Sequence, residues 1–130
     1  MKSKLFLIVT LCCIATAART DNSPPDATIV SSAAYEASHV LKPAKGLLIS
    51  LVGYNSKASA QFIQLFNSTT VPADTAIPIY TFTVPASSNF SLDVPITGMR
   101  FGTGIAVSNS STGPTKTIGS ADCWFTAVIR

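Results

Sequence analysis

The sequence has few charged residues. Only 12% of its 130 residues are Asp, Glu, Lys or Arg, about half of the usual share near 25%. Beyond residue 17 the Lys and Arg residues are scattered singly, and they form no basic stripe of the kind that a phosphate backbone requires. We therefore expect no nucleic-acid partner. A disordered chain is also excluded, because 47% of the residues are hydrophobic.

The residue groups that catalysis and metal binding require are also missing. The chain has one histidine, His39, no Gly-x-Ser-x-Gly motif around a serine nucleophile, and no pair of acids on one expected strand face. It has neither the Cys and His spacings of zinc sites nor the Asp-x-Asp-x-Asp-Gly loop of calcium sites. We expect a protein that is not an enzyme, with no catalytic residues, no bound metal and no cofactor.

The N-terminal segment, residues 1–17, has the pattern of a secretory signal peptide. Lys2 and Lys4 precede an apolar run at residues 5–14, and Ala-Thr-Ala at residues 15–17 supplies the small residues of a cleavage site. The apolar run is too short to span a bilayer, which takes about 20 residues. The alternatives are an uncleaved anchor and lipid attachment at Cys12 or Cys13, and an uncleaved segment would be the only contact of the chain with a membrane.

Cysteine is scarce once this segment is removed. Two of the three cysteines leave with it, so Cys123 remains alone and no disulfide within the chain is possible. Cys123 lies in an alternating stretch, residues 121–129, in which it shares one face with Phe125 and Trp124 points to the other. We interpret Cys123 as a small buried apolar side chain rather than a reactive thiol.

Apolar runs separated by polar connections predict an all-β chain. The central stretch, residues 46–66, has two runs rich in β-formers on either side of a polar connection, which predicts a β-hairpin in the middle of a covered sheet. Residues 27–32 and 35–41 are expected to form one bent strand or two short ones. Further strands are expected at residues 77–84, 90–96, 101–109 and 122–129.

These elements predict one β-sandwich domain over residues 27–130, with seven or eight strands and a jelly-roll or related Greek-key topology. Residues 18–26 are polar and contain Pro-Pro, so we expect an extended leader there. Gly102 and Gly104 share one face of an expected strand. This spacing indicates a β-bulge or the close approach of another backbone.

The candidate binding residues are two aromatic residues and the polar groups near them or in the polar loop at residues 110–119. Tyr54, at the tip of the expected hairpin, and Trp124 are suited to stacking on a sugar ring or to anchoring a subunit interface, and packing at the rim of the core is the alternative. The complete candidate set is Tyr54, Asn55, Lys57, Thr112, Lys116 and Trp124.

Three Asn-x-Ser/Thr triplets begin at Asn67, Asn89 and Asn109. All three fall in expected loops or strand ends, where a eukaryotic secretory route would allow glycosylation. Such triplets also arise by chance in a chain rich in Ser and Thr.

Three stretches of the chain resemble small uncharacterised proteins of tailed phages and prophages. They are residues 53–65 (GYNSKASAQFIQL), 82–92 (FTVPASSNFSL) and 109–125 (NSSTGPTKTIGSADCWF). The resemblance implies a virion-associated β-sandwich, such as a decoration or fibre-type subunit, with no active-site residues to carry over.

The sequence as a whole favours a non-enzymatic structural or binding module that is exported to the periplasm or the extracellular space, or is carried on a virion surface. Low charge and the lack of a disulfide favour a homo-oligomer or a particle-bound subunit, because subunit contacts add stability. The alternative function is a secreted lectin-like domain whose partner is a glycan.

Overall fold

The computed structural model describes residues 27–95 and 97–130, so the expected signal peptide (1–17) and leader (18–26) lie outside the described residues. The described residues form nine β-strands and no helix, which confirms the all-β prediction. No described segment is therefore a helix long and apolar enough to cross a membrane.

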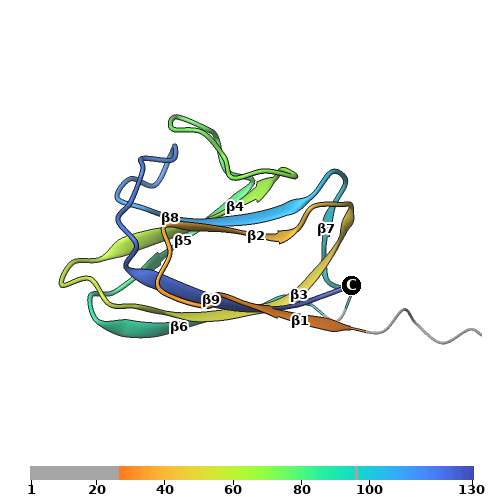
Figure 1. Cartoon of the computed structure of the whole chain (residues 1–130), viewed down its shortest axis with the longest axis horizontal. Helices are drawn as coiled ribbons and strands as arrows, with labels where there is room; N and C mark the ends of the chain where they lie inside the picture. The colour runs from red at the N-terminus through yellow and green to blue at the C-terminus, as the bar shows by residue number, and fades with distance from the viewer. Residues whose placement is uncertain (1–26, 96) are drawn as a thin grey trace, which may run out of the picture.

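The strands form two antiparallel sheets, which Figure 1 shows as two layers. Sheet A has the order β1 (Thr28–Ser31), β9 (Cys123–Ile129), β3 (Gly46–Asn55) and β6 (Ser88–Asp93), with β7 (Met99–Phe101) beside the first residues of β3. Sheet B has the order β2 (Ser38–Lys42), β8 (Ile105–Ser110), β4 (Gln61–Asn67) and β5 (Tyr80–Val84). The strand count exceeds the expected seven or eight because β7 is a separate short strand that begins before the strand expected at residues 101–109.

The strand pairs are nested along the chain. β1 pairs with β9, β2 with β8, β3 with β6 and β7, and β4 with β5. The first half of the chain therefore pairs antiparallel with the second half and forms one long two-stranded ribbon. The segment at residues 68–79, between β4 and β5, joins the two halves. Consecutive strands lie in different sheets except at the β4–β5 and β6–β7 connections. Residues 27–41 accordingly give two short strands, β1 and β2, in different sheets.

The predicted β-hairpin at residues 46–66 is wrong, because β3 lies in sheet A and β4 in sheet B. The side chain of Asn55 directs the crossing at residues 56–60. Its Oδ1 accepts a 3.0 Å hydrogen bond from the Lys57 N–H, and its Nδ2 donates to the carbonyls of Ser59 (3.1 Å) and Pro85 (2.9 Å). Both strands have neighbours on both edges, so the central position predicted for each is confirmed.

The hydrophobic core lies between the two sheets. On β9 the burial alternates, and Cys123 and Phe125 are fully buried as their predicted shared face requires. Ile63 and Leu65 of β4 are fully buried in the same cluster. Each large apolar side chain buried in this way contributes about 1.5–3 kcal/mol to folding, so the interface between the sheets holds the sandwich together without a disulfide.

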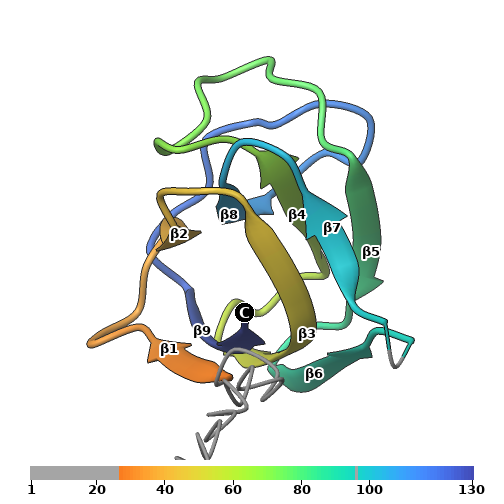
Figure 2. The same ribbon diagram turned by 90° about the vertical axis from the view of Figure 1, so that its right-hand side faces the viewer.

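Two loops of the same chain cover the outer face of sheet B. The Gln64 side chain, on that face, donates hydrogen bonds to the 111–119 loop. The 68–79 loop joins this loop through two backbone bonds of 2.8 Å, from Thr75 N–H to the Lys116 carbonyl and from Lys116 N–H to the Ala76 carbonyl. Figure 2 shows both loops above sheet B. This cover explains why all six residues of β8 are buried.

The stretch expected as one strand at residues 101–109 is divided between the sheets. β7 ends at Phe101 in sheet A, and β8 begins at Ile105 in sheet B. A Cβ atom on Gly104 would lie 2.5 Å from the Ser68 carbonyl oxygen, which confirms a close backbone approach at this glycine. A Cβ atom on Gly102 would have no atom of the described residues within 4 Å, apart from its own chain neighbours. Of these two glycines in the connection between β7 and β8, only Gly104 lies against another backbone segment.

Candidate functional site

Tyr54 and Trp124 are direct partners across β3 and β9. The residues directly before and after each of them in the chain are buried. Because successive side chains of a strand point to opposite faces, both aromatic side chains project from the outer face of sheet A. Asn89 of β6 is the partner of Tyr54 on the other side and is exposed. The structure thus brings together the two aromatic residues that the sequence singled out.

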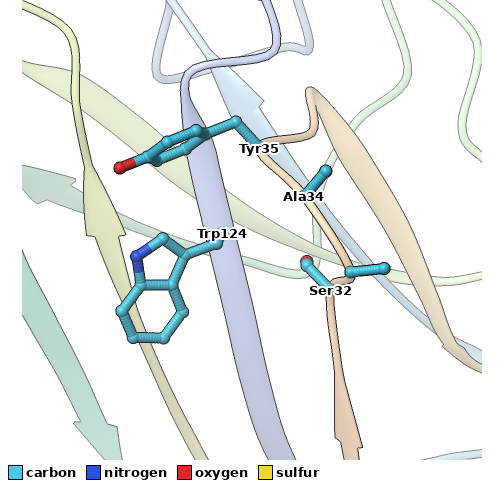
Figure 3. A pocket seen from close by; sticks show the side chains of 5 residues that line it. Ser32, Ala34, Tyr35 and Trp124 are labelled. Atoms are coloured by element: carbon cyan, nitrogen blue, oxygen red, sulfur yellow. The ribbon is translucent and has the colours of Figure 1, made fainter.

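The loop between β1 and β2 extends this aromatic row. Ser32, Ala33, Ala34, Tyr35 and Trp124 line a pocket of about 250 Å³. Figure 3 shows the Tyr35 ring and the Trp124 indole projecting in the same direction, with Ser32 and Ala34 beside them. Tyr35 is 48% exposed. Sequence analysis missed Tyr35 as a site residue because it was assigned to a strand.

Hydrogen bonds to β9 fix both ends of this loop. The Ser32 N–H donates to the Phe125 carbonyl at 2.8 Å, and the Ser32 Oγ accepts from the Phe125 N–H at 3.1 Å. The Glu36 N–H donates to the Cys123 carbonyl at 2.6 Å. Because the anchors lie on both sides of the pocket residues, the pocket is formed before any ligand arrives.

The pocket presents flat ring faces next to neutral hydrogen-bonding groups. Within residues 27–95 and 97–130, the indole nitrogen of Trp124 and the hydroxyl of Tyr35 have no protein hydrogen-bond partner, and neither ring belongs to the aromatic pairs, which lie along Tyr80, Phe82, Phe90 and Phe125. Of the residues that the structure describes, none that lines the pocket is charged. Such a site suits a neutral ligand that combines an apolar face with hydroxyl groups.

Asn55 and Lys57 lie at the same end of the molecule but are engaged within the chain. Asn55 is fully buried, and its amide holds the crossing between the sheets. The Lys57 ammonium lies 3.6 Å from the Asp122 carboxylate and donates to the Ser120 hydroxyl at 3.3 Å. Both residues therefore support the loops around the aromatic row rather than lining its pocket.

Thr112 and Lys116 lie in the loop that covers sheet B, so the structure does not bring them together with Tyr54 and Trp124. The Thr112 hydroxyl donates to the Thr115 carbonyl at 2.8 Å. Lys116 is only 5% exposed, and its ammonium donates to the Pro72 carbonyl. Burial lowers the pKa of Lys116, and the nearby Asp74 carboxylate acts in the opposite direction.

The residues of most interest for catalysis are held in structural contacts. Burial raises the pKa of Cys123 to about 12, and the Asp122 carboxylate acts in the same direction, so the thiol stays protonated at neutral pH. His39 Nδ1 lies 2.8 Å from Glu36 Oε2. Among the described residues, no three His, Cys, Asp or Glu side chains are placed to hold a metal ion together.

A second pocket, of about 390 Å³, lies at the other end of sheet A. It is lined by Lys42, Lys45, Gly46, Leu47, Arg100, Phe101, Gly102 and Arg130. Sequence analysis missed this gathering of basic side chains because they are far apart in the chain. Only the register of β7, β3 and β9 brings them together.

Comparisons with protein-family models, with curated proteins and with solved structures found no match for this chain.

Proposed function

We propose that this chain is a non-enzymatic binding module that acts on an exported surface or a virion surface, and that it binds through the outer face of sheet A. The observation that carries the proposal is the row of Tyr35, Trp124 and Tyr54 beside a preformed pocket. The engaged states of Cys123 and His39 favour binding over catalysis.

The nested strand pairs support a jelly-roll topology. In a jelly roll, a long antiparallel ribbon wraps into two four-stranded sheets. The orders β1-β9-β3-β6 and β2-β8-β4-β5 fit this wrapping, with β7 as an addition beside β3. Jelly rolls serve as viral capsid domains and as lectins, so this topology is compatible with both functions favoured by the sequence.

The ligand that the pocket fits best is a neutral glycan. A sugar ring has an apolar face that packs on an aromatic ring and hydroxyl groups that accept or donate hydrogen bonds at its rim. Trp124 supplies an indole N–H, and Tyr35 and Ser32 supply hydroxyls within the same pocket. The secretory pattern of residues 1–17 supports this function, because it would bring the domain to extracellular glycans.

A glycan array followed by titration tests the proposal. Calorimetric titration measures the affinity of every variant, and the fluorescence of Trp124, the only tryptophan of the chain, reports on the pocket in the variants that keep it. We expect Trp124→Ala and Tyr35→Ala to lower the affinity for a neutral oligosaccharide at least tenfold. Tyr80→Ala is the matched control, because Tyr80 is 40% exposed but lies in sheet B. The proposal fails if no glycan binds, or if binding is unchanged by Trp124→Ala.

Self-association is the second candidate function, supported by apolar residues in the middle of the same face. Ile29, which is 71% exposed, is the partner of Val128, and Val52, which is 37% exposed, lies one row further along the sheet. A second copy of the chain would cover these residues. Light scattering at high concentration should show a dimer or larger oligomer that Val52→Lys disrupts and Ile118→Lys, a change in the loop over sheet B, does not. A strict monomer would remove this candidate.

Location on a virion surface and export from the cell predict different experimental results. A virion-surface subunit should purify with phage particles, as the resemblance to phage proteins implies. An exported module should appear free in the culture supernatant with residues 1–17 removed. N-terminal sequencing of the purified chain distinguishes the two, and an intact N-terminus on a cytoplasmic chain would contradict export.

A further inference from the structure

Four basic side chains from four separate segments line one pocket at the end of sheet A opposite the aromatic row. Lys42 ends β2, Lys45 lies in the turn before β3, Arg100 lies in β7, and Arg130 follows β9. They are four of the six Lys and Arg residues that the structure describes. A chain with few charges thus concentrates most of its positive charge in one place.

The sheet register holds the two arginines on either side of Leu47. Arg100 is the partner of Leu47 in β7, and Leu47 exchanges two backbone hydrogen bonds with Arg130, of 2.8 and 2.9 Å. Leu48 is fully buried, so Leu47 and its two partners project from the outer face of sheet A. Two inter-strand spacings place the arginine Cα atoms about 10 Å apart, a span that allows both guanidinium groups to reach one ligand.

Lys42 is seated over the backbone of Gly46. A Cβ atom on Gly46 would lie 2.8 Å from Lys42 Cδ, 3.1 Å from Lys42 Nζ and 2.5 Å from the Arg130 carbonyl oxygen. Only glycine therefore leaves room for this lysine stem at the side of the pocket. The lysine is half-buried, so its ammonium is held near the pocket instead of extending freely into solvent.

Within the described residues, no Asp or Glu carboxylate pairs with these four cations. The described ion pairs are His39–Glu36 and Lys57–Asp122, and both lie toward the end of sheet A at which β9 begins. The main-chain carbonyl oxygen of Arg130 accepts a 2.8 Å hydrogen bond from the Leu47 N–H at the same pocket. No carboxylate of the described residues therefore pairs with the four cations, and like charges at close range oppose one another unless an anion joins them.

We propose that this pocket binds the sulfate or carboxylate groups of an acidic polysaccharide that also reaches the aromatic pocket. The inference rests on the proposed function, since Arg100 and Arg130 of this pocket project from the same outer face of sheet A as Trp124. From Leu47 to Tyr54 is about 23 Å along β3. The partnered outer positions between them on β3 and β9 include the uncharged Ser50, Val52 and Thr126, and one acid, Asp93, lies beside Ser50 on β6. Arginine pairs bind oxyanions by two parallel hydrogen bonds. A nucleic acid would instead need a continuous basic row, and the basic residues here are confined to one end of the face.

The test compares three ligands of the full chain by calorimetry: a dextran sulfate oligosaccharide, an unsulfated dextran oligosaccharide of equal length, and inorganic sulfate. We expect the sulfated oligosaccharide to bind at least tenfold more tightly than either of the others, with an affinity that falls as salt is added. The double variant Arg100→Gln, Arg130→Gln should reduce its affinity to that of the unsulfated one. Thr83→Glu, which adds a negative charge at an exposed position of sheet B, is the control for lower net positive charge elsewhere, and thermal unfolding verifies that each variant folds.

Four outcomes overturn the inference: equal affinity for the sulfated and unsulfated oligosaccharides, no effect of the arginine changes, equal affinity for inorganic sulfate, or equally tight binding of a duplex DNA of matched charge. Failure of the proposed function looks different. Binding of the sulfated oligosaccharide that needs both arginines but is unchanged by Trp124→Ala would overturn the neutral-glycan site and the shared ligand. Binding that needs Trp124 but not the arginines would overturn only the acidic-polysaccharide inference.

Discussion

The side-chain amide of Gln64 donates a 2.8 Å hydrogen bond to the carbonyl oxygen of Thr112, and thereby fixes the covering loop to sheet B. The same nitrogen lies 2.9 Å from the Gly113 carbonyl and 3.2 Å from the Thr115 carbonyl. Gln64 is a polar residue in a run of apolar residues, and it is fully buried. The loop, whose inward-facing carbonyls need a donor, therefore explains the amide nitrogen of Gln64, whereas the side-chain oxygen is buried with no partner among the described residues.

Gln64→Leu should release this loop. We expect the free energy of unfolding to fall by about 1–3 kcal/mol, because buried carbonyl groups lose their donor. Hydrogen exchange should accelerate at residues 111–119 and stay unchanged in β3 and β9. Thr81→Val is the control, since the Thr81 hydroxyl makes only a 3.4 Å bond to Gly113 in the same loop. Equal effects of the two changes would contradict the anchoring role of Gln64.

Gly53 gives the sharpest packing prediction. A Cβ atom there would lie 2.2 Å from the Trp124 carbonyl oxygen and 2.3 Å from Phe90 Cζ. Gly53→Ala should lower the free energy of unfolding by about 1–3 kcal/mol, because the backbone of β9 must move. Gly102→Ala should change it by no more than about 0.5 kcal/mol, since nothing lies within 4 Å of that position. Denaturant titrations of both variants measure the difference, and a neutral Gly53→Ala would refute the close approach.

Cys123 predicts a loss of stability at alkaline pH. In the unfolded chain its thiol ionises near pH 9, whereas burial raises the folded pKa to about 12. Between these values the unfolded state binds fewer protons, so the contribution of this group falls by about 1.4 kcal/mol for each pH unit. Below pH 9 it is constant. The difference in unfolding free energy between the natural chain and Cys123→Ala should therefore change with pH only above pH 9, and parallel curves would contradict the buried, protonated thiol.

The existence of most strands was predictable because alternation reports local burial. The Cys123 face of β9 was correct for this reason. Alternation does not say which sheet a strand joins, and a five-residue connection suits a hairpin as well as a crossing. The hairpin prediction failed at this point, since the turn at Asn55 is stabilised by the Pro85 carbonyl, which belongs to a distant segment.

The candidate site was predictable only in part. Trp124 stood out because it faced away from the apolar side of its strand, and Tyr54 because it was placed at the tip of the expected hairpin. Tyr35 joins them through the anchoring of its loop to β9, and Arg100 and Arg130 meet through the pairing of β7 and β9 with β3. These relationships depend on long-range register, which the local sequence pattern does not contain.

The three Asn-x-Ser/Thr triplets occupy different environments, and this predicts where a glycan is tolerated. Asn109 is fully buried, so its modification is incompatible with the folded core. Asn89 is exposed beside Tyr54, and Asn67 is exposed at the end of β4 in sheet B.

If the chain is secreted from eukaryotic cells, a glycan on Asn89 should shield Trp124 from acrylamide quenching and block ligand binding. The variant Asn89→Gln should restore both the acrylamide quenching of Trp124 and ligand binding. Asn67→Gln should leave Trp124 shielded. Mass spectrometry of the folded fraction identifies the occupied sites, and a glycan on Asn109 in that fraction would contradict its position in the core.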